Sequence, residues 1–242
     1  MKAIILAAGI GSRLQPYTNE IPKCLLEVNN ETLLSRQLRI LENSGIKKVI
    51  IVTGYKAEKI EKEVLKFNQL DICFVNNKNF IKTNPIDSFL LCEPYIDSHF
   101  ILLNSDIYFH DSIINKMLAK DGNCVVIDSS SEYSKNEFIV NHDERYYVTQ
   151  IEKNLPHRPY HQGISVQISK FDLSGKNRIF EKVKKNYKSS QILFPTDSFD
   201  VLVKQKSLYA VDIAGSFWYE IDTVEGYLNL NKILKSADSE IK

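Results

Sequence analysis

Residues 2–25 read KAIILAAGIGSRLQPYTNEIPKCL and join an apolar run to a glycine-containing loop and two cations. The run AIILAA is short, rich in branched side chains and stopped by Gly9, so it predicts a buried strand. Gly9 and Gly11 allow a loop whose backbone N–H groups face outward, with Arg13 inside it and Lys23 at its end. A glycine loop after a strand, followed by two cations, is typical of a polyphosphate site. The alternative is an ordinary strand-to-helix turn with two solvated cations.

Two commoner phosphate-binding loops are excluded by spacing. The dinucleotide fingerprint needs a third small residue three positions after its second glycine, and Leu14 stands there. The Walker loop needs a Gly-Lys-Ser/Thr triplet, and none follows Gly9.

Composition narrows the class of protein. The chain has 242 residues and a formal net charge of +1, which fits an α/β domain with an ample core. Near-neutral charge argues against a nucleic-acid partner, and no apolar stretch approaches the ~20 residues of a membrane span. Because a cleaved leader would remove the glycine motif, we expect a cytoplasmic protein. The sequence leaves the oligomeric state open.

Beyond the first strand, strand-like runs alternate with a helical pattern. Residues 48–54 and 71–76 predict buried strands, and residues 57–67 predict an amphipathic helix between them. This order favours a parallel sheet with right-handed crossovers. From residue 129 onward, short alternating runs predict antiparallel strands. We therefore expect an α/β fold in a single domain, residues 1–242: a Rossmann-like mixed, mainly parallel sheet flanked by helices, with a small appended antiparallel portion.

The glycine loop resembles part of a longer signature. Nucleotidyltransferases that activate sugar phosphates and related phosphoesters carry the pattern L-A-A-G-x-G-x-R-L-x-P-x-T-x-x-x-P-K. This chain matches it at Leu6, Ala7, Ala8, Gly9, Gly11, Arg13, Leu14, Pro16, Thr18, Pro22 and Lys23. The resemblance implies that Leu6, Ala7, Ala8, Gly9 and Gly11 bind the nucleotide. It also implies that Arg13 and Lys23 are catalytic.

A second part of the resemblance lies in a polar segment before a predicted helix. The superfamily often has an Asn-x-x-x-Ser pattern near the nucleotide, and Asn84 and Ser88 keep that spacing. The resemblance implies that both bind the nucleotide. The alternative is an ordinary loop with a helix cap.

Two acidic residues are implied metal ligands. Residues 99–109 predict a strand that ends at Asp106, at the carboxyl edge where open α/β sheets bind ligands. The superfamily places one metal-binding Asp here and a second in an Asp-Thr segment near the C-terminus, which matches Asp222. The alternatives are helix caps, although Asp111 is better placed than Asp106 for the helix near residues 113–118. Paired carboxylates favour Mg²⁺ as the cofactor.

The resemblance also implies a reaction. The short length and the segment Glu-Ile-Asp-Thr look like the small-acceptor cytidylyltransferases, such as the bacterial phosphocholine enzymes. They imply transfer of CMP from CTP to phosphocholine, phosphoethanolamine, a phosphonate or a phosphorylated amino acid such as glutamine phosphate, with release of pyrophosphate, for surface-polysaccharide decoration. One alternative is a sugar-1-phosphate uridylyl- or thymidylyltransferase, and another is a non-catalytic nucleotide-binding module.

The acceptor is expected to contact the portion at residues 129–215. The polar loop at residues 152–162 contains His157, Arg158 and His161, which suit an anionic or zwitterionic acceptor. It also contains Lys153, a weaker candidate than Lys23 for contact with a phosphate. Lys153, Arg158 and Trp218 are the predicted acceptor-binding residues. The alternative for this loop is a solvated surface turn.

Overall fold

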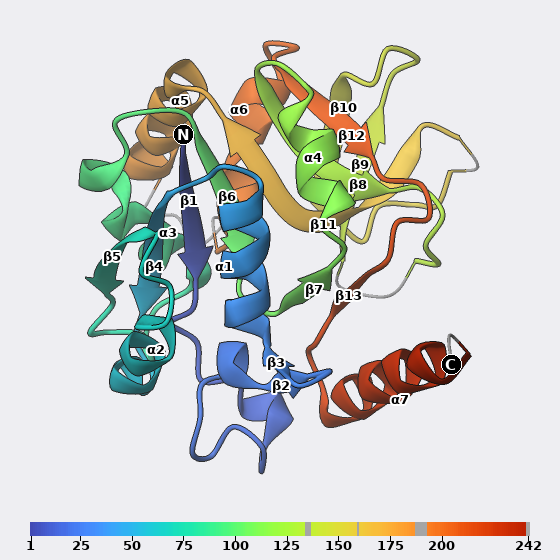
Figure 1. The fold of residues 1–242 in the computed structure, drawn as a ribbon. Coiled ribbons are helices and arrows are strands. Elements are labelled where there is room, and N and C mark those ends of the chain that lie inside the picture. Colours follow the sequence, from blue (N-terminus) through green and yellow to red (C-terminus); the bar gives the residue numbers. More distant parts are fainter. Residues whose placement is uncertain (134–136, 159, 187–192, 241–242) are drawn as a thin grey trace.

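A mixed β-sheet forms the centre of the molecule (Figure 1). The computed structural model describes residues 1–133, 137–158, 160–186 and 193–240. Seven strands follow the order β10 (Val148–Lys153), β9 (Phe138–His142), β11 (Gln162–Phe171), β6 (Phe100–Asn104), β1 (Lys2–Leu6), β4 (Lys48–Thr53) and β5 (Asp71–Asn76). Two more strands branch from β11: β8 (Asn123–Asp128) pairs with β11, and β12 (Leu208–Asp212) pairs with β8. Positions 134–136, 159 and 187–192 of the predicted acceptor-binding portion lie outside the described residues.

The first half of the sheet is parallel. β1 lies between β4 and β6, and β5 continues the sheet beyond β4. Ile5 stands opposite Ile51 on one side and Leu103 on the other, so the branched run at the N-terminus is buried on both faces. The carboxyl ends of β1, β4 and β6 therefore meet at one edge, where α/β sheets bind ligands.

The second half adds antiparallel strands to the same sheet. β11 runs antiparallel to β6, β8 and β9, and β10 pairs antiparallel with β9. The later strand β12 returns parallel to β8. The expected α/β fold, with a mainly parallel sheet and an antiparallel portion, is confirmed.

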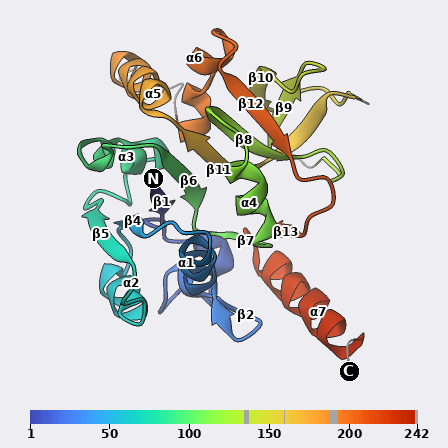
Figure 2. The ribbon, with the colours of Figure 1, turned by 45° about the horizontal axis from the view of Figure 1, so that its top comes forward.

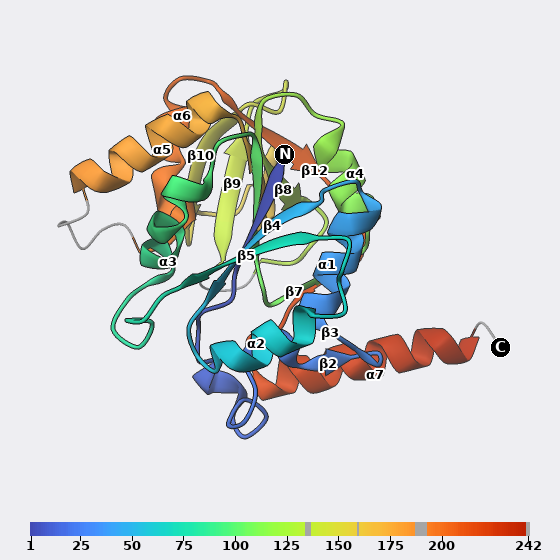
Figure 3. The same cartoon turned by 60° about the vertical axis from the view of Figure 1, so that its left-hand side comes forward.

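Helices cover both faces of the sheet, as Figure 3 shows. One face carries α1 (Leu33–Asn43), α2 (Ala57–Val64) and α4 (Ser112–Leu118), and the other carries α3 (Pro85–Leu91), α5 (Leu173–Asn186) and α6 (Asp200–Val203). Short 3₁₀ turns are η1 (Ser12–Leu14), η2 (Lys23–Leu25), η3 (Glu93–Tyr95) and η4 (Pro195–Ser198). A separate apolar core lies on each face, because each group of helices buries its own stripe against the sheet.

The predicted strand at residues 99–109 is divided in two. β6 ends at Asn104, a turn holds Ser105 and Asp106, and β7 (Ile107–Phe109) continues in a different direction. The division has a pairing cause, because β6 belongs to the main sheet while β7 pairs antiparallel with β13 (Trp218–Glu220). Asp106 is thereby held between two anchored strands.

The last helix, α7 (Val224–Glu240), projects away from the sheet (Figures 1 and 2). Its first turns pack through Leu230 on a small apolar cluster that includes Leu14, Leu26 and Ile221. The hairpin of β2 (Glu27–Val28) and β3 (Glu31–Thr32) lies beside it. Every described helix is too short or too polar to span a bilayer.

Candidate active site

A cavity of about 690 Å³ opens at the carboxyl ends of β1 and β6, a size typical of small-molecule sites. Most of the residues proposed from the sequence line it: Leu6, Ala7, Ala8, Gly9, Gly11, Arg13, Lys23, Asn84, Ser88, Asp106, Lys153 and Asp222. These residues come from both halves of the sheet, so the fold brings together positions that are up to 216 residues apart (from 6 to 222).

The signature loop is held by backbone and side-chain contacts. The Ala7 N–H donates to the Val52 carbonyl at 2.9 Å, which continues the strand pairing into the cavity wall. Gly11 has φ +69°, and a Cβ there would lie 3.1 Å from the Lys23 Cβ. The buried Thr18 hydroxyl donates to the Gly11 carbonyl at 2.8 Å. The signature spacing is therefore explained by a left-handed turn that packs directly on Lys23.

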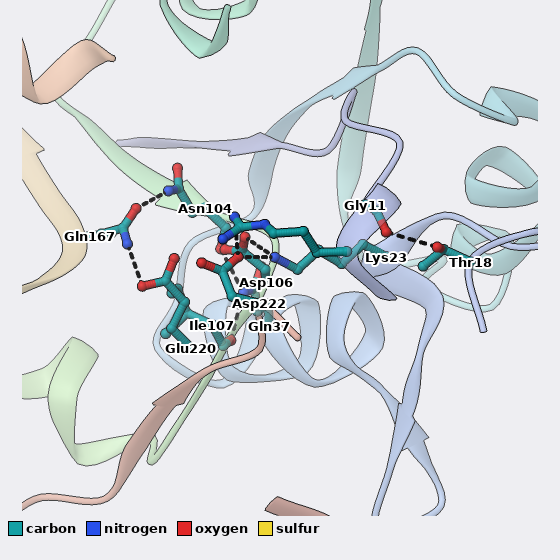
Figure 4. A network of polar contacts seen from close by, with 11 residues as sticks. Gly11, Thr18, Lys23, Gln37, Asn104, Asp106, Ile107, Gln167, Glu220 and Asp222 are labelled. Carbon is teal, nitrogen blue, oxygen red and sulfur yellow. Dashed lines mark hydrogen bonds and ion pairs between the residues drawn. The ribbon is translucent and has the colours of Figure 1, made fainter. Parts of the chain in front are cut away.

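A compact charged centre lies below this loop. The Lys23 Nζ contacts Asp106 Oδ2 at 2.8 Å and Asp222 Oδ1 at 2.7 Å, and the Arg13 guanidinium contacts Asp222 at 3.1 Å (Figure 4). Burial by itself would lower the pKa of Lys23, but the charges of the two carboxylates outweigh it and raise that pKa above its ordinary value. Burial would likewise raise the pKa of Asp222, yet Lys23 and Arg13 hold it below its ordinary value.

Glu220 is a third carboxylate of this centre, and the sequence analysis did not propose it. One carboxylate oxygen from each of Asp106, Glu220 and Asp222 lies within 4.8 Å of the other two. Burial, followed by the nearby charges of Asp106 and Asp222, raises the pKa of Glu220 to about 8. The sequence offers a usable signal here, because Glu220 ends β13 and stands two positions before Asp222, so both carboxylates follow from one short segment.

The carboxylate cluster fits a hard divalent cation. Such ions prefer oxygen ligands, and one or two carboxylates suffice when phosphate oxygens complete the shell. Asp106 Oδ1 is buried and has no hydrogen-bond partner among the described residues. A buried acceptor of that kind is costly unless a cation or donor satisfies it, so the donor set and this orphaned oxygen both suit a metal.

Amide side chains support the cluster from behind. Gln37 of α1 donates through Nε2 to the carbonyls of Asn104 and Ile107, each at 2.9 Å, and so fixes the turn that carries Asp106. The Gln167 Nε2 donates to Glu220 Oε2 at 2.8 Å, and the Gln167 Oε1 accepts from the Asn104 side chain (Figure 4). None of these three amides was anticipated, because each comes from a different element.

The α3 side of the cavity is polar and tightly bonded. Asn77 is buried and donates through Nδ2 to Thr83 and to Ser88, each at 3.0 Å. Asn84 stands at the N-cap position of α3, where its N–H donates to the Asp87 carboxylate at 2.7 Å. A helix cap and a nucleotide contact are thus compatible interpretations of this segment, because Asn84 occupies the cap position and also lines the cavity. Asn77 was missed by the sequence analysis.

The three proposed acceptor residues lie in different places. The Lys153 ammonium is inside the cavity, 3.9 Å from the Phe194 ring centre and 4.9 Å from that of Phe138. Arg158 is exposed and lines a separate hollow. The Trp218 indole donates to Asp128 Oδ2 at 2.8 Å and does not reach the cavity surface. The structure therefore brings only Lys153 to the charged centre's cavity.

The sequence model of the MobA-like NTP transferase domain matches residues 3–182, about three quarters of the chain. The chain belongs to this family. It is 28% identical over 240 residues to the choline-phosphate cytidylyltransferase of Streptococcus pneumoniae, covering 98% of this chain and 100% of that protein. It is 32% identical over 137 residues to the CTP:phosphoglutamine cytidylyltransferase of Campylobacter jejuni, covering 54% of this chain and 53% of that protein.

Other relatives widen the range of substrates within the family. The bifunctional IPC transferase and DIPP synthase of Aquifex aeolicus is 30% identical over 96% of this chain, which spans 51% of that protein. Among solved structures, the CTP:phosphocholine cytidylyltransferase from Streptococcus pneumoniae superposes with a TM-score of 0.77 and 25% identity, covering 96% of this chain and 98% of that one. This chain therefore shares its fold with that cytidylyltransferase, and the names of the relatives point to different acceptors.

Proposed function

We propose that this protein is a Mg²⁺-dependent cytidylyltransferase that transfers CMP from CTP to a small phosphorylated acceptor and releases pyrophosphate. One observation carries the proposal: Arg13 and Lys23 of the glycine loop meet the carboxylates of Asp106, Glu220 and Asp222 at one end of a cavity lined by Lys153. Two of the relatives are cytidylyltransferases, one matched over 98% of this chain and the other over 54%, and they support CTP as the proposed donor.

The reaction joins two anions. An oxygen of the acceptor phosphate forms a bond to the α-phosphorus of CTP, and the bond from that phosphorus to the bridging oxygen of the leaving pyrophosphate breaks. The attacking oxygen is already negative near pH 7, so no general base is required. The site must instead align the two groups and neutralise the charge that accumulates on the leaving oxygens.

The cations of the signature loop suit that task. Arg13 is exposed at the cavity mouth, and its planar fork matches phosphate oxygens. Lys23 is a compact charge at the base of the loop. We propose that a bound triphosphate draws both cations away from Asp222 and towards its own oxygens.

The carboxylates freed in this way would hold the metal. Asp106, Asp222 and Glu220 are the proposed Mg²⁺ ligands, with phosphate oxygens and water completing the shell. When bound, the ion supplies charge neutralisation at the phosphates. Leu6, Ala7, Ala8, Gly9, Gly11, Asn84 and Ser88 remain the proposed nucleotide contacts, and Asn77 joins them because it fixes Ser88.

The acceptor is proposed to bind beside Lys153. That ammonium favours an acceptor with an anionic group besides its phosphate, such as glutamine phosphate or a phosphonate that carries a carboxylate, and it disfavours phosphocholine and phosphoethanolamine, whose second charge is positive. Arg158 would have to act from its separate hollow. Trp218 would act only through β13, which also carries Glu220. A cytoplasmic place in surface-polysaccharide decoration stays a prediction.

The first test is pyrophosphate release with Mg²⁺, three nucleotides and a panel of acceptors. A site built for the exocyclic amine of cytosine leaves a polar group unpaired with uracil, so CTP should exceed UTP and dTTP by about tenfold or more. The acceptor panel is phosphocholine, phosphoethanolamine, glutamine phosphate and hexose 1-phosphates.

The results of this panel distinguish the proposed activity from its two alternatives. Equal rates with UTP or dTTP, together with use of a hexose 1-phosphate, would move the protein to the sugar-phosphate branch. No release with any combination would favour a non-catalytic nucleotide-binding module. Asp106→Asn serves as the inactive control, because Asp106 is a proposed metal ligand.

A further inference from the structure

β11 contains a local break in its backbone geometry at Gln167. Gln167 has φ +59°, a left-handed backbone conformation that residues other than glycine, asparagine and aspartate rarely adopt. The pairing of β11 with β8 shifts register between Ser165 and Ser169, on either side of this residue. The Gln167 N–H donates to the Ser165 hydroxyl at 3.2 Å, which stabilises the irregular turn of the strand. Bulges of this kind are enriched next to active sites, where they redirect a side chain.

The Gln167 side chain lies apart from the core that its neighbours enter. Val166 and Ile168 are both fully buried in the core that includes α1, α2 and α4, whereas Gln167 lines the cavity. The amide is engaged at both ends, since it accepts from Asn104 and donates to Glu220 at 2.8 Å (Figure 4). A costly backbone conformation is thus linked to one polar contact with the carboxylate cluster.

Glu220 has little else to fix it. It ends β13, a three-residue strand that pairs only with the equally short β7 among the described residues. Asp106 and Asp222 lie beside it, and their negative charges disfavour an ionised Glu220. Gln167 donates to Glu220 Oε2, and the other oxygen, Oε1, accepts no hydrogen bond in the part of the chain that the structure describes. One oxygen is therefore anchored to the main sheet, and the other is available to the cluster.

We infer that Gln167 is a positioning residue, which the break in β11 aims at Glu220 so that the three carboxylates form a divalent-cation site. The inference rests on the proposed function, because it assumes that the cluster binds a cation. Partners that orient metal ligands from behind typically change metal affinity 10–100-fold when they are replaced.

The test measures Mn²⁺ binding by electron paramagnetic resonance for the wild type and two variants, with the protein alone and with CTP present, and Mn²⁺ with CTP but no protein is the blank. Gln167→Met keeps the length of the side chain and removes both hydrogen bonds. Gln167→Asn suits the left-handed backbone but is too short for the geometry that reaches Glu220. Both variants should weaken Mn²⁺ binding by about tenfold or more. In turnover assays they should raise the Mg²⁺ concentration for half-maximal rate while leaving the KM for CTP nearly unchanged.

The matched control is Gln150→Met on β10, a glutamine outside the cavity that bonds to Asn141. It should bind Mn²⁺ as the wild type does. A purely structural role for Gln167 predicts that Gln167→Asn keeps wild-type affinity, and that result would overturn the inference while leaving the proposed function standing. A wild-type protein that binds Mn²⁺ neither alone nor with CTP present would instead remove the cation site itself, and the inference with it.

Discussion

Lys23 is the counter-ion of the carboxylate cluster in the free protein. It is largely buried and lies between Asp106 and Asp222, at 2.8 and 2.7 Å. Two neighbouring carboxylates without it would repel each other in a site of reduced solvent access. The same ammonium is proposed to move to the triphosphate, so nucleotide binding would free the carboxylates for the metal, and nucleotide and metal would favour each other's binding. This explains physically why a lysine stands at the end of the signature.

Lys23→Met tests the dual role. Turnover should fall by roughly 10²-fold, the usual cost of removing one charge-stabilising donor. Mn²⁺ binding by the free protein should be kept or strengthened, because the competing ammonium is gone. Steady-state kinetics and Mn²⁺ titration measure the two effects. Lys66→Met, which removes an exposed ion pair with Glu63, is the matched control and should change neither. Turnover within a few-fold of the wild type would contradict the role of Lys23.

The short strand β13 is tied to the main sheet at both of its ends. At one end Glu220 accepts from Gln167 of β11, and at the other the Trp218 indole donates to Asp128 at the end of β8. Asp128 also accepts from the Ser130 hydroxyl at 2.6 Å. Burial by itself would raise the pKa of Asp128, but the hydrogen bonds from the serines and Trp218 hold it below its ordinary value. Asp128 is therefore a structural anchor for the element that presents Glu220.

Asp128→Asn should lower the free energy of unfolding by about 1–3 kcal/mol at pH 7, the range for a buried hydrogen-bonded charge. A carboxyl whose pKa is lowered by folding stabilises the protein above its ordinary pKa of 3.8 and loses that contribution as the pH falls through its folded value. The difference between wild type and variant should therefore shrink between pH 7 and pH 3. Urea unfolding at both pH values measures it, with the exposed Asp71→Asn as control. A difference that stayed constant or grew towards pH 3 would contradict this role.

The elements that the sequence predicted are those whose signals are local. Residues 2–25 contain a strand, a left-handed glycine and two cations in one run, so their proximity follows from chain connectivity. Asp106 and Asp222 were proposed as metal ligands because both match positions of a familiar signature, and the structure brings both into contact with Lys23. Gln167 could not be found in this way, because a regular alternation along β11 does not specify a register shift. The polar composition of the loop that contains Arg158 likewise does not say which hollow it borders.

At the scale of the whole molecule, the cavity lies where the two halves of the sheet meet. The parallel half supplies the signature loop and α3, and the antiparallel half supplies Lys153 and Gln167. Asp222 links them, because it follows β13 and contacts Arg13 and Lys23 from the far end of the chain. The sequence analysis predicted a nucleotide side through resemblance and an acceptor side through the position and polarity of the loop at residues 152–162, but no local pattern encodes how β11 comes to lie against β6.

The central claim is that Asp222 belongs to a metal-dependent transfer site, and Asp222→Asn tests it most directly. The measurement is pyrophosphate release from CTP with the best acceptor of the panel, across a range of Mg²⁺ concentrations. The variant should lose turnover by roughly 10²-fold or more, because metal stabilisation of phosphate charge is worth several kcal/mol, while its melting temperature stays close to that of the wild type. Glu225→Gln, which removes an exposed charge three positions further on, should stay active. Near-normal turnover of Asp222→Asn at limiting Mg²⁺ would contradict the account.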